Sequence, residues 1–355
     1  MIEVYEARRE KLRAIMHERG IDALFISHEA NRYYLSGFEL HDGQKNEYSG
    51  YLLITKDGND KLFTDPRFLD AAKRLWEHSC ILIYQGNAAE AINSHLKDVG
   101  YGTIGFESKT LPFSFATTLL DGLTCIEGDG LVEELRVIKD AHEIECLKKA
   151  CNLNHKLMEW LPSVLFPERT ELAIAWDIEK FFRENGASEL AFASIVAVGP
   201  NAALPHAIPG KTQLTENSPI LIDVGCRVDD YCSDQTRTFW VGSKPTEEFT
   251  RTMEYVRAAQ DAAIAAMKPG MLTSEAHAVA RKVFEDAGVE KFFTHSLGHG
   301  VGLETHEAPS VNPRSETVLA PGMVVTAEPG LYYPEWGGIR WEHMVLITED
   351  GCVRL

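Results

Sequence analysis

The sequence has no apolar run that approaches the ~18–20 residues of a membrane-spanning helix. Its first residues, Met1–Glu6, include acids and no apolar h-region, so we expect no secretory signal peptide. Basic residues are also in deficit, with 35 Lys and Arg against 53 Asp and Glu and a formal net charge of -18. No basic stripe offsets this excess. A protein that neutralises nucleic-acid phosphates is therefore excluded, and some of the acids are available to hold cations.

Closely spaced cysteine pairs are absent as well. The seven cysteines are odd in number and scattered, with no C-x-x-C. We therefore expect free thiols in a reducing cytoplasm and no disulfide framework. The rest of the composition, with 45% hydrophobic and 25% charged residues, is that of a globular protein. A length of 355 residues predicts two domains or one large one.

Helical and strand patterns alternate along the first part of the chain. A helix is predicted over Glu6–Arg19, ending at Gly20, and a buried strand over Ile21–Ser27. This βα alternation continues to about residue 130 and predicts a layered α/β domain. Beyond it, Asp140-x-x-Glu143 has the spacing of a capping box and predicts the start of a long helix. We therefore expect two domains, 1–130 and 131–355.

Two aspartates stand on neighbouring strand-like segments of the second domain. Asp223 ends the apolar run 218–222, and Asp234 begins a strand-like segment eleven residues later. If these segments form a hairpin whose turn is centred between Val228 and Asp229, Asp223 and Asp234 are cross-strand partners. Directly opposed Cβ atoms lie about 4.5–5.5 Å apart. Two like charges at that distance repel unless a cation lies between them.

Two glutamates repeat this arrangement near the C-terminus. Glu328 ends a predicted strand that begins at Met323, and Glu342 lies in a predicted strand over 338–348. Strict alternation along that strand places Arg340, Glu342 and Met344 on one face. The Pro- and Gly-containing segment between the strands suits a loop that folds them together. Glu328 and Glu342 are then expected to converge as the aspartates do.

A histidine-rich segment lies between the two acid pairs. His295 and His299 have the spacing of H-E-x-x-H, but Ser296 replaces the Glu and three glycines argue against the helix that this motif needs. We expect a glycine-rich strand or loop, with His306 seven residues after His299. His206, further upstream, precedes Asp223 by seventeen residues.

Taken together, four carboxylates and one or two imidazoles form a hard, oxygen-rich donor set. It suits a pair of divalent ions such as Mn²⁺, Co²⁺, Fe²⁺ or Zn²⁺ better than a thiolate zinc site. Bridging carboxylates can hold two ions ~3.5–4 Å apart, where they acidify a water molecule. Taken singly, each acid or histidine is more typical of a turn, a cap or a solvated position. We interpret His28, Arg32 and His41 as surface groups, and Cys226 and Cys232 as packing residues.

The ordered set of acids and imidazoles carries a family resemblance. It resembles the five-ligand signature of the pita-bread metallopeptidases, and the segment from His295 to His306 is similar to that of Xaa-Pro peptidases. The resemblance extends through Leu131–Lys139 to Glu143, typical of the domain junction. Arg9–Leu12, Asp22–Leu24 and Asn31–Phe38 are similar to a creatinase-type N-terminal domain. The chain is thus identified as a member of the aminopeptidase P and prolidase family. The implied fold is a creatinase-like α/β mixed sheet followed by an α+β pita-bread catalytic domain.

The resemblance also implies a role for each site residue. Asp223 would bind one metal ion, Asp234 and Glu342 would bridge both, and His299 and Glu328 would bind the other. Glu328 would also shuttle a proton. His206 and His306 would stabilise the gem-diolate, His295 would shape the proline pocket, and Arg340 would orient a ligand carboxylate.

The same resemblance implies Mn²⁺ or Co²⁺ as cofactors, with Zn²⁺ or Fe²⁺ as alternatives, and a homodimer. The expected substrates are small peptides with proline in second position, with no nucleic-acid or membrane partner. Methionine aminopeptidases usually lack this N-terminal domain, creatinase lacks the metal-ligand set, and non-catalytic peptide-binding homologues lose ligands that this chain retains.

Substrate length separates two activities. A strict dipeptidase (prolidase) needs a cation for the carboxylate that follows proline, and an Arg fork suits it. Several prolidases carry an Arg four residues after the last histidine of the motif, where this chain has Ser310. Arg314 and Arg340 are the remaining candidates. We therefore favour aminopeptidase P-like activity, with prolidase as the alternative.

Overall fold

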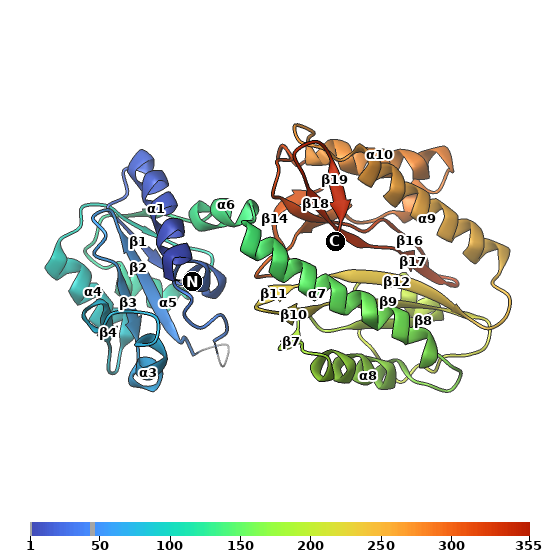
Figure 1. Cartoon of the computed structure of the whole chain (residues 1–355), viewed down its shortest axis with the longest axis horizontal. Coiled ribbons are helices and arrows are strands. Elements are labelled where there is room, and N and C mark those ends of the chain that lie inside the picture. Colours follow the sequence, from blue (N-terminus) through green and yellow to red (C-terminus); the bar gives the residue numbers. More distant parts are fainter. Residues whose placement is uncertain (1, 43–46) are drawn as a thin grey trace. The chain divides into compact units, whose positions relative to one another are not determined.

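The computed structural model describes residues 2–42 and 47–355. The chain divides into two compact units, Met1–Arg136 and Val137–Leu355 (Figure 1). The predicted domain boundary, at residue 130, lies where the helix α6 (Leu131–Val137) begins. Among the described residues, no helix is long and apolar enough to cross a membrane.

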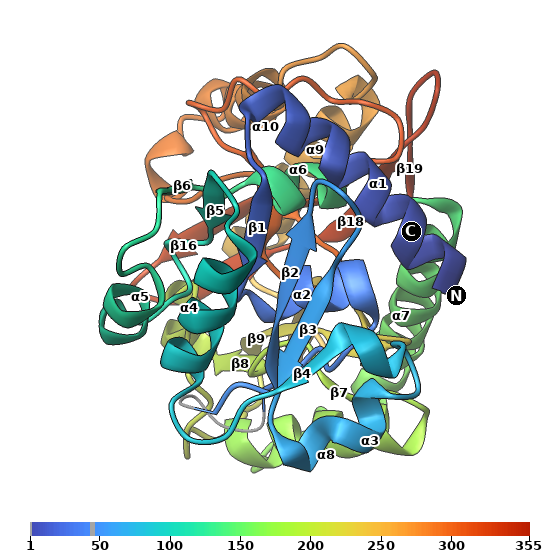
Figure 2. The same ribbon diagram turned by 90° about the vertical axis from the view of Figure 1, so that its left-hand side faces the viewer.

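The first unit is built on a six-stranded mixed sheet in the order β4-β3-β2-β1-β5-β6. Its strands are β1 (Ala23–Ile26), β2 (Gly50–Thr55), β3 (Lys61–Thr64), β4 (Ile81–Ile83), β5 (Ile104–Phe106) and β6 (Cys125–Glu127). Its helices are α1 (Ile2–Arg19), α2 (Glu29–Ser36), α3 (Leu69–Ala72), α4 (Ala88–Val99) and α5 (Phe113–Leu119). Helices α4 and α5 lie beside the sheet (Figure 2). Their apolar side chains, among them Ile92, Leu96 and Leu119, share one buried core with residues of the strands. The expected layered α/β domain is confirmed.

One side chain of this unit corrects the sequence interpretation. Arg32 is fully buried and is not a surface group. Its guanidinium donates to the carbonyl oxygens of Gly50 at 2.7 Å and Glu39 at 2.6 Å, and it pairs with Asp42 at 2.9 Å. Backbone carbonyls and one carboxylate therefore replace the water that a buried guanidinium loses.

The second unit contains several small sheets flanked by four long helices. Their strands form the orders β12-β9-β8, β11-β10-β7, β14-β13-β15-β18-β19 and β16-β17. The strands are β7 (Glu189–Leu190), β8 (Ile195–Val198), β9 (Ser218–Val224), β10 (Cys226–Val228), β11 (Tyr231–Cys232), β12 (Gln235–Val241), β13 (Gly298–Gly300), β14 (Glu307–Val311), β15 (Val324–Ala327), β16 (Gly330–Tyr333), β17 (Gly337–Arg340), β18 (His343–Ile347) and β19 (Cys352–Arg354). The helices are α7 (Ala141–Trp160), α8 (Glu171–Glu184), α9 (Glu247–Ala266) and α10 (Thr273–Asp286).

Two apolar cores hold the helices against these sheets. One core joins α7 and α8 to β8 and β9 through residues such as Leu157, Ile178 and Ile222. The other joins α9 and α10 to β15 and β18 through residues such as Val256 and Val345. The strands therefore lie between the α7–α8 and α9–α10 pairs (Figure 1).

The start of α7 confirms the capping box that the sequence predicted. The Asp140 side chain accepts the backbone N–H of Glu143 at 2.9 Å, and the Glu143 carboxylate accepts the backbone N–H of Asp140 at 3.0 Å. These reciprocal bonds satisfy two donors at the helix N-terminus. The residue before the cap, Lys139, donates its backbone N–H to the carbonyl of Gly322 at 2.9 Å.

Candidate active site

A cavity of about 610 Å³ opens in the second unit, and most of the predicted site residues line it. Its walls contain Phe192, the segment 205–209 and residues of β9, β13 and β17. The predicted residues that line it are His206, Asp223, Asp234, His295, His299, His306, Glu328 and Arg340. Glu342 lies beside Asp234 and His299, within the same group of donor atoms.

The aspartates reach this cavity in a different register from the predicted one. Asp223 pairs with Thr236, not with Asp234. The turn is centred on Asp229 and Asp230, which both have positive φ, 50° and 70°. Two such residues form a two-residue turn of type I′, which fixes the register of the flanking strands.

Asp234 nevertheless faces the same side of the hairpin as Asp223. It precedes Thr236 by two residues, so alternation places Asp234 and Thr236 on one face. Asp234 is thus the diagonal neighbour of Asp223 and lies at a break in the ladder between β9 and β10. There a side chain at Gly225 would meet the carbonyl oxygen of Ser233 at 2.1 Å. The backbones approach closely here, and the two carboxylates still point into one cavity.

The glutamates converge because two strand pairs share one register. β15 pairs with β18 and β16 pairs with β17, and in both pairs the same register would place Glu328 opposite Glu342. The predicted continuous strand over 338–348 is wrong, because β17 ends at Arg340 and β18 begins at His343. In the interruption the backbone N–H of Glu342 donates to the carbonyl of Thr236 at 3.2 Å. This contact turns the chain towards β12 and brings Glu342 to the aspartates.

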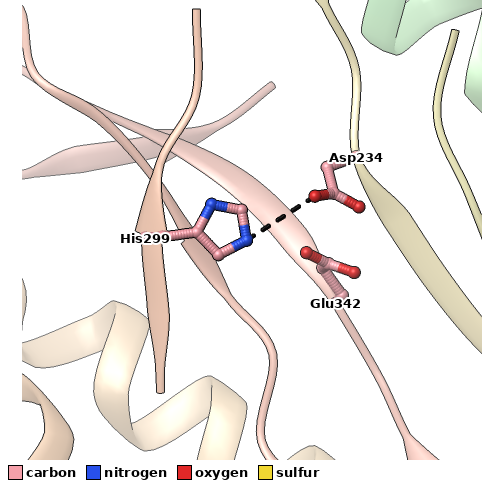
Figure 3. A group of neighbouring side chains, drawn as sticks. All are labelled: Asp234, His299 and Glu342. Atoms are coloured by element: carbon pink, nitrogen blue, oxygen red, sulfur yellow. Dashed lines mark ion pairs between the residues drawn. The ribbon is translucent and has the colours of Figure 1, made fainter. Parts of the chain in front are cut away.

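Three side chains form a compact group of potential metal ligands. Donor atoms of Asp234, His299 and Glu342 all lie within 4.8 Å of one another (Figure 3). His299 Nε2 lies 3.6 Å from Asp234 Oδ2 and 3.2 Å from Glu328 Oε1. His299 Nδ1 lies 3.1 Å from the carbonyl oxygen of Gly300, which favours the tautomer with the proton on Nδ1. In a neutral His299, Nε2 presents its lone pair to the acids, as a metal ligand must. In the metal-free protein, burial opposes protonation, but the hydrogen bond to Glu328 outweighs it and raises the pKa of His299.

The negative charges of the carboxylates in this group are only partly neutralised by neighbouring cationic side chains. Burial, and then the neighbouring carboxylates, raise the pKa of Asp234 and of Glu342 well above their usual range. Glu328 differs. Burial opposes its ionisation, but the hydrogen bond and charge of His299 outweigh it and lower the pKa of Glu328 to about 2. In the described part of the chain, Asp223 Oδ1 and Glu342 Oε1 are buried and have no hydrogen-bond partner. Buried oxygens of this kind, in an acidic cluster, fit divalent cations.

Arg340 is the buried cation that orders the acids. It is 3% exposed, and its Nη2 donates to Asp223 Oδ2 at 2.7 Å. Its Nε donates to Thr236 Oγ1 at 3.1 Å, and the same hydroxyl donates to Glu342 Oε2 at 2.7 Å. One guanidinium therefore orients two carboxylates, one directly and one through a threonine, and leaves one oxygen of each free.

Arg340 also reaches His295 through a residue that the sequence analysis missed. Its Nη1 donates to the hydroxyl of Tyr332 at 2.9 Å, and that hydroxyl lies 2.8 Å from His295 Nε2. His295 Nδ1 lies 2.7 Å from the carbonyl of Ser296, so Tyr332 donates to Nε2. The sequence around Tyr332 predicts only a buried strand residue and gives no sign that its hydroxyl has a role in the site.

Two threonines were missed as well, although alternation offered a signal. Thr236 follows Asp234 by two residues and binds Glu342, as above. Thr326 precedes Glu328 by two residues, donates to Glu328 Oε1 at 3.0 Å and accepts the backbone N–H of His299 at 3.0 Å. Residues two apart on a strand share a face. A threonine two positions from a candidate ligand is therefore a predictable partner.

The accessory histidines lie at the cavity but outside the buried acid group. The His306 ring lies 4.2 Å from the His299 ring between centroids. Burial, and then the charge of His299, lower the pKa of His306. His206 lines the same cavity from the segment 205–209. A ring N–H at either position can donate a hydrogen bond to a substrate oxygen.

Arg314 is the one candidate that the structure does not bring to the site. It is exposed in the turn after β14, and it is not among the residues that line the cavity. Ser310, at the position discussed for prolidases, does line the cavity. Among the described residues that form the lining, Arg340 is the one arginine or lysine.

Comparisons with known proteins show the family to which the chain belongs. Residues 145–349 match metallopeptidase family M24, and residues 8–138 match the creatinase/prolidase N-terminal domain. The chain is 37% identical to an Xaa-Pro dipeptidase of Pyrococcus furiosus, covering 98% of this chain and 97% of that protein.

Solved structures are similar over nearly the whole chain. An Xaa-Pro dipeptidase from Bacillus anthracis has 33% identity and a TM-score of 0.92, covering 99% of this chain and 97% of that one. An X-Pro aminopeptidase from Thermotoga maritima has 31% identity and a TM-score of 0.83, covering 95% and 96%. The chain therefore belongs to metallopeptidase family M24, whose members use divalent metal ions, and it is a hydrolase with a creatinase/prolidase N-terminal domain and a pita-bread catalytic domain.

Proposed function

We propose that the protein hydrolyses the bond between an N-terminal residue and a following proline, at a site for two divalent ions. The observation that carries the proposal is a pair of buried oxygens, Asp223 Oδ1 and Glu342 Oε1, that have no hydrogen-bond partner among the described residues. Asp223 lines the cavity of about 610 Å³, and Glu342 lies beside the lining residues Asp234 and His299. Bound divalent ions would polarise the scissile carbonyl and make a water molecule nucleophilic at neutral pH. The names of the similar proteins, Xaa-Pro dipeptidase and X-Pro aminopeptidase, support proline in second position.

Five residues would hold the ions. Asp223 would bind one, and His299 and Glu328 the other, with Asp234 and Glu342 bridging them. The geometry supports this set because His299 Nε2 faces Asp234 and Glu328, and because Arg340 and Thr236 fix the outer oxygens of Asp223 and Glu342. Partners of this kind orient ligands and reduce the entropy lost on metal binding.

Proton transfer would fall to Glu328. Its carboxylate lies 3.2 Å from His299 Nε2, beside the group of potential metal ligands, where an ionised carboxylate can act as a general base. It would take a proton from the attacking water and deliver it to the proline nitrogen as the bond breaks. His206 and His306 would donate hydrogen bonds to the oxygen on which negative charge develops. His295, held by Tyr332, would shape the pocket for the proline ring.

We further propose an aminopeptidase-like preference for peptides longer than two residues. A dipeptide places a free carboxylate directly after proline, and that charge needs a cation. Among the described residues that line the cavity, Arg340 is the one lysine or arginine. Its three guanidinium nitrogens already donate to Asp223, Thr236 and Tyr332. Strict dipeptidase activity is the second candidate, favoured by the names of the relatives from Pyrococcus furiosus and Bacillus anthracis.

Paired kinetics decide between these activities. We expect a higher kcat/KM for Ala-Pro-Ala than for Ala-Pro, and a rise for Ala-Pro in Ser310→Arg, which supplies a guanidinium at the cavity wall. Ser315→Arg, outside the lining, is the matched control. If the unaltered enzyme cleaves Ala-Pro but not Ala-Pro-Ala, it is a dipeptidase.

A second experiment tests the preference for proline. Replacement of proline by alanine in the substrate should lower kcat/KM at least about tenfold, because the proline amide has no N–H and a fixed ring. Equal rates would indicate a general aminopeptidase.

The native ion, the assembly and the compartment complete the proposal. We infer Mn²⁺ or Co²⁺, supported by the predominance of oxygen donors. A homodimer is supported by the resemblance and by exposed apolar side chains on α8, Leu172 and Trp176, which are 50% and 66% exposed. Light scattering that gives a mass near 40 kDa would contradict the dimer. A reducing, cytoplasmic location is supported by the seven free cysteines.

A further inference from the structure

A buried ion pair lies directly beside His306. Lys139 Nζ is 3.2 Å from Glu307 Oε2, and the two side chains are 1% and 5% exposed. Lys139 immediately precedes Asp140, the capping residue of α7, and Glu307 immediately follows His306. Because an unpaired charge is costly in the interior, the ion pair lowers the cost of burying both groups.

The Glu307 carboxylate organises the segment that leads to His306. Its Oε1 accepts the backbone N–H of Glu304 at 3.1 Å. It also packs against the backbone of Gly302, where an added Cβ would lie 2.5 Å from Glu307 Oε2. The segment 302–307 is thus folded around this carboxylate, and Lys139 holds the carboxylate from the other side.

His306 itself has no comparable anchor. Within the described residues, its ring has no hydrogen bond, and the side chain is exposed at the cavity. Its two chain neighbours are held instead. Thr305 Oγ1 donates to the carbonyl of Ala191 at 3.1 Å, and Glu307 binds Lys139. The position of the His306 ring over the cavity therefore depends on backbone that these two contacts fix.

We infer that Lys139 is a positioning residue for the reaction. Its ammonium holds Glu307, and Glu307 holds the segment 302–307 so that His306 stays over the substrate carbonyl. This inference rests on the proposed function, because His306 meets a substrate only if the cavity binds one. Small displacements of a group that must align with a reacting oxygen can cost about 100-fold in rate.

The kinetic test is a double-mutant cycle on the Mn²⁺-loaded enzyme with Ala-Pro-Ala. We expect Lys139→Met to lower kcat about tenfold, with KM changed less than threefold, because a positioning residue acts on His306 after the substrate binds. We expect His306→Ala to lower kcat about 100-fold, and the double variant to match His306→Ala within about twofold. Effects that multiply in the double variant would overturn the inference. Lys149→Met removes an exposed ion pair with Asp229, 50% and 52% exposed, and serves as the matched control with unchanged kcat.

Hydrogen exchange of the metal-free protein tests the clamp without any activity. Lys139→Met should speed exchange of the Glu304 amide, in a peptide fragment spanning 301–310, by about tenfold. Lys139→Met should leave exchange in β12 unchanged, and Lys149→Met should leave exchange in 301–310 unchanged. Unchanged exchange in 301–310 would overturn the inference, even for an active enzyme. Faster exchange in an enzyme that fails to cleave Ala-Pro-Ala would support the clamp and refute the proposed function.

Discussion

Glu342→Gln is expected to stabilise the metal-free protein while weakening its affinity for metal. Among the described residues, Glu342 Oε1 is buried without a hydrogen-bond partner, and the carboxylates of Asp223, Asp234 and Glu328 lie near it. A glutamine keeps the oxygen that accepts from Thr236 and turns its NH₂ towards the remaining acids. The substitution thus replaces a repelled charge with a donor, at the cost of a metal ligand.

The size of the effect follows from the unpaired oxygen. A buried acceptor without a partner costs about 1–3 kcal/mol. For a unit of 150–250 residues, each kcal/mol shifts Tm by about 2–4 °C. In excess chelator, Glu342→Gln should therefore raise the Tm of the catalytic unit by about 2–12 °C. With saturating Mn²⁺ the order should reverse, because ligand binding stabilises the wild-type protein more.

The pH dependence of this gain has a definite sign. The pKa of Glu342 is raised in the folded, metal-free protein. The folded protein therefore tolerates Glu342 when the carboxyl is protonated at low pH, and it loses stability as pH rises through the folded pKa and the carboxyl ionises. Wild type and Glu342→Gln should therefore differ more at pH 8 than at pH 5. The measurement is thermal unfolding followed by circular dichroism, in chelator, across that range.

Glu335→Gln is the matched control, because Glu335 is exposed in the turn between β16 and β17. It removes the same charge from the chain without touching the acid group, and it should leave Tm within about 1 °C. A Tm for Glu342→Gln in chelator at or below that of the wild type would refute the reasoning. An equal gain in Glu335→Gln would assign the effect to net charge.

Three further substitutions test individual roles. Glu328→Gln should lower kcat about 10²–10⁴-fold with metal content retained, and a loss below tenfold would remove Glu328 as the proton shuttle. Tyr332→Phe deletes the hydroxyl between His295 and Arg340, and should lower kcat/KM on Ala-Pro-Ala roughly tenfold; an unchanged value would show that this bridge is not needed. Arg314→Ala should leave kcat/KM on Ala-Pro-Ala within about twofold, and a large loss would place this exposed side chain at the substrate.

The candidate site was predictable because its residues stand at strand ends. Apolar runs that stop at Asp223 and Glu328 are visible in the sequence. Asp234 and Glu342 lie on strand-like segments as well, and they complete the set of four carboxylates. The exact pairing was not predictable from these runs. Asp229 and Asp230 form the turn, and the choice between this turn and one centred a residue earlier depends on two left-handed backbone conformations that Asp merely tolerates.

The contacts that support the site depend on tertiary structure. Tyr332 is a strand residue whose hydroxyl becomes important only when β17 brings Arg340 beside it. The burial of Arg32 could not be predicted from the local sequence. The carbonyls that accept its hydrogen bonds belong to Gly50 and Glu39, outside its own helix. Arg314 lies near the histidine motif in sequence, yet the turn after β14 leaves it exposed. Proximity along the chain does not determine which cations reach a cavity.

Metal titration of the stripped enzyme tests the central claim most directly. The protein is treated with chelator, dialysed, and reconstituted with increasing Mn²⁺ while metal content and cleavage of Ala-Pro-Ala are measured on the same samples. The account predicts no activity without metal, full activity near two ions per chain, and products Ala and Pro-Ala. Activity that persists in metal-free enzyme, or products Ala-Pro and Ala, would contradict it.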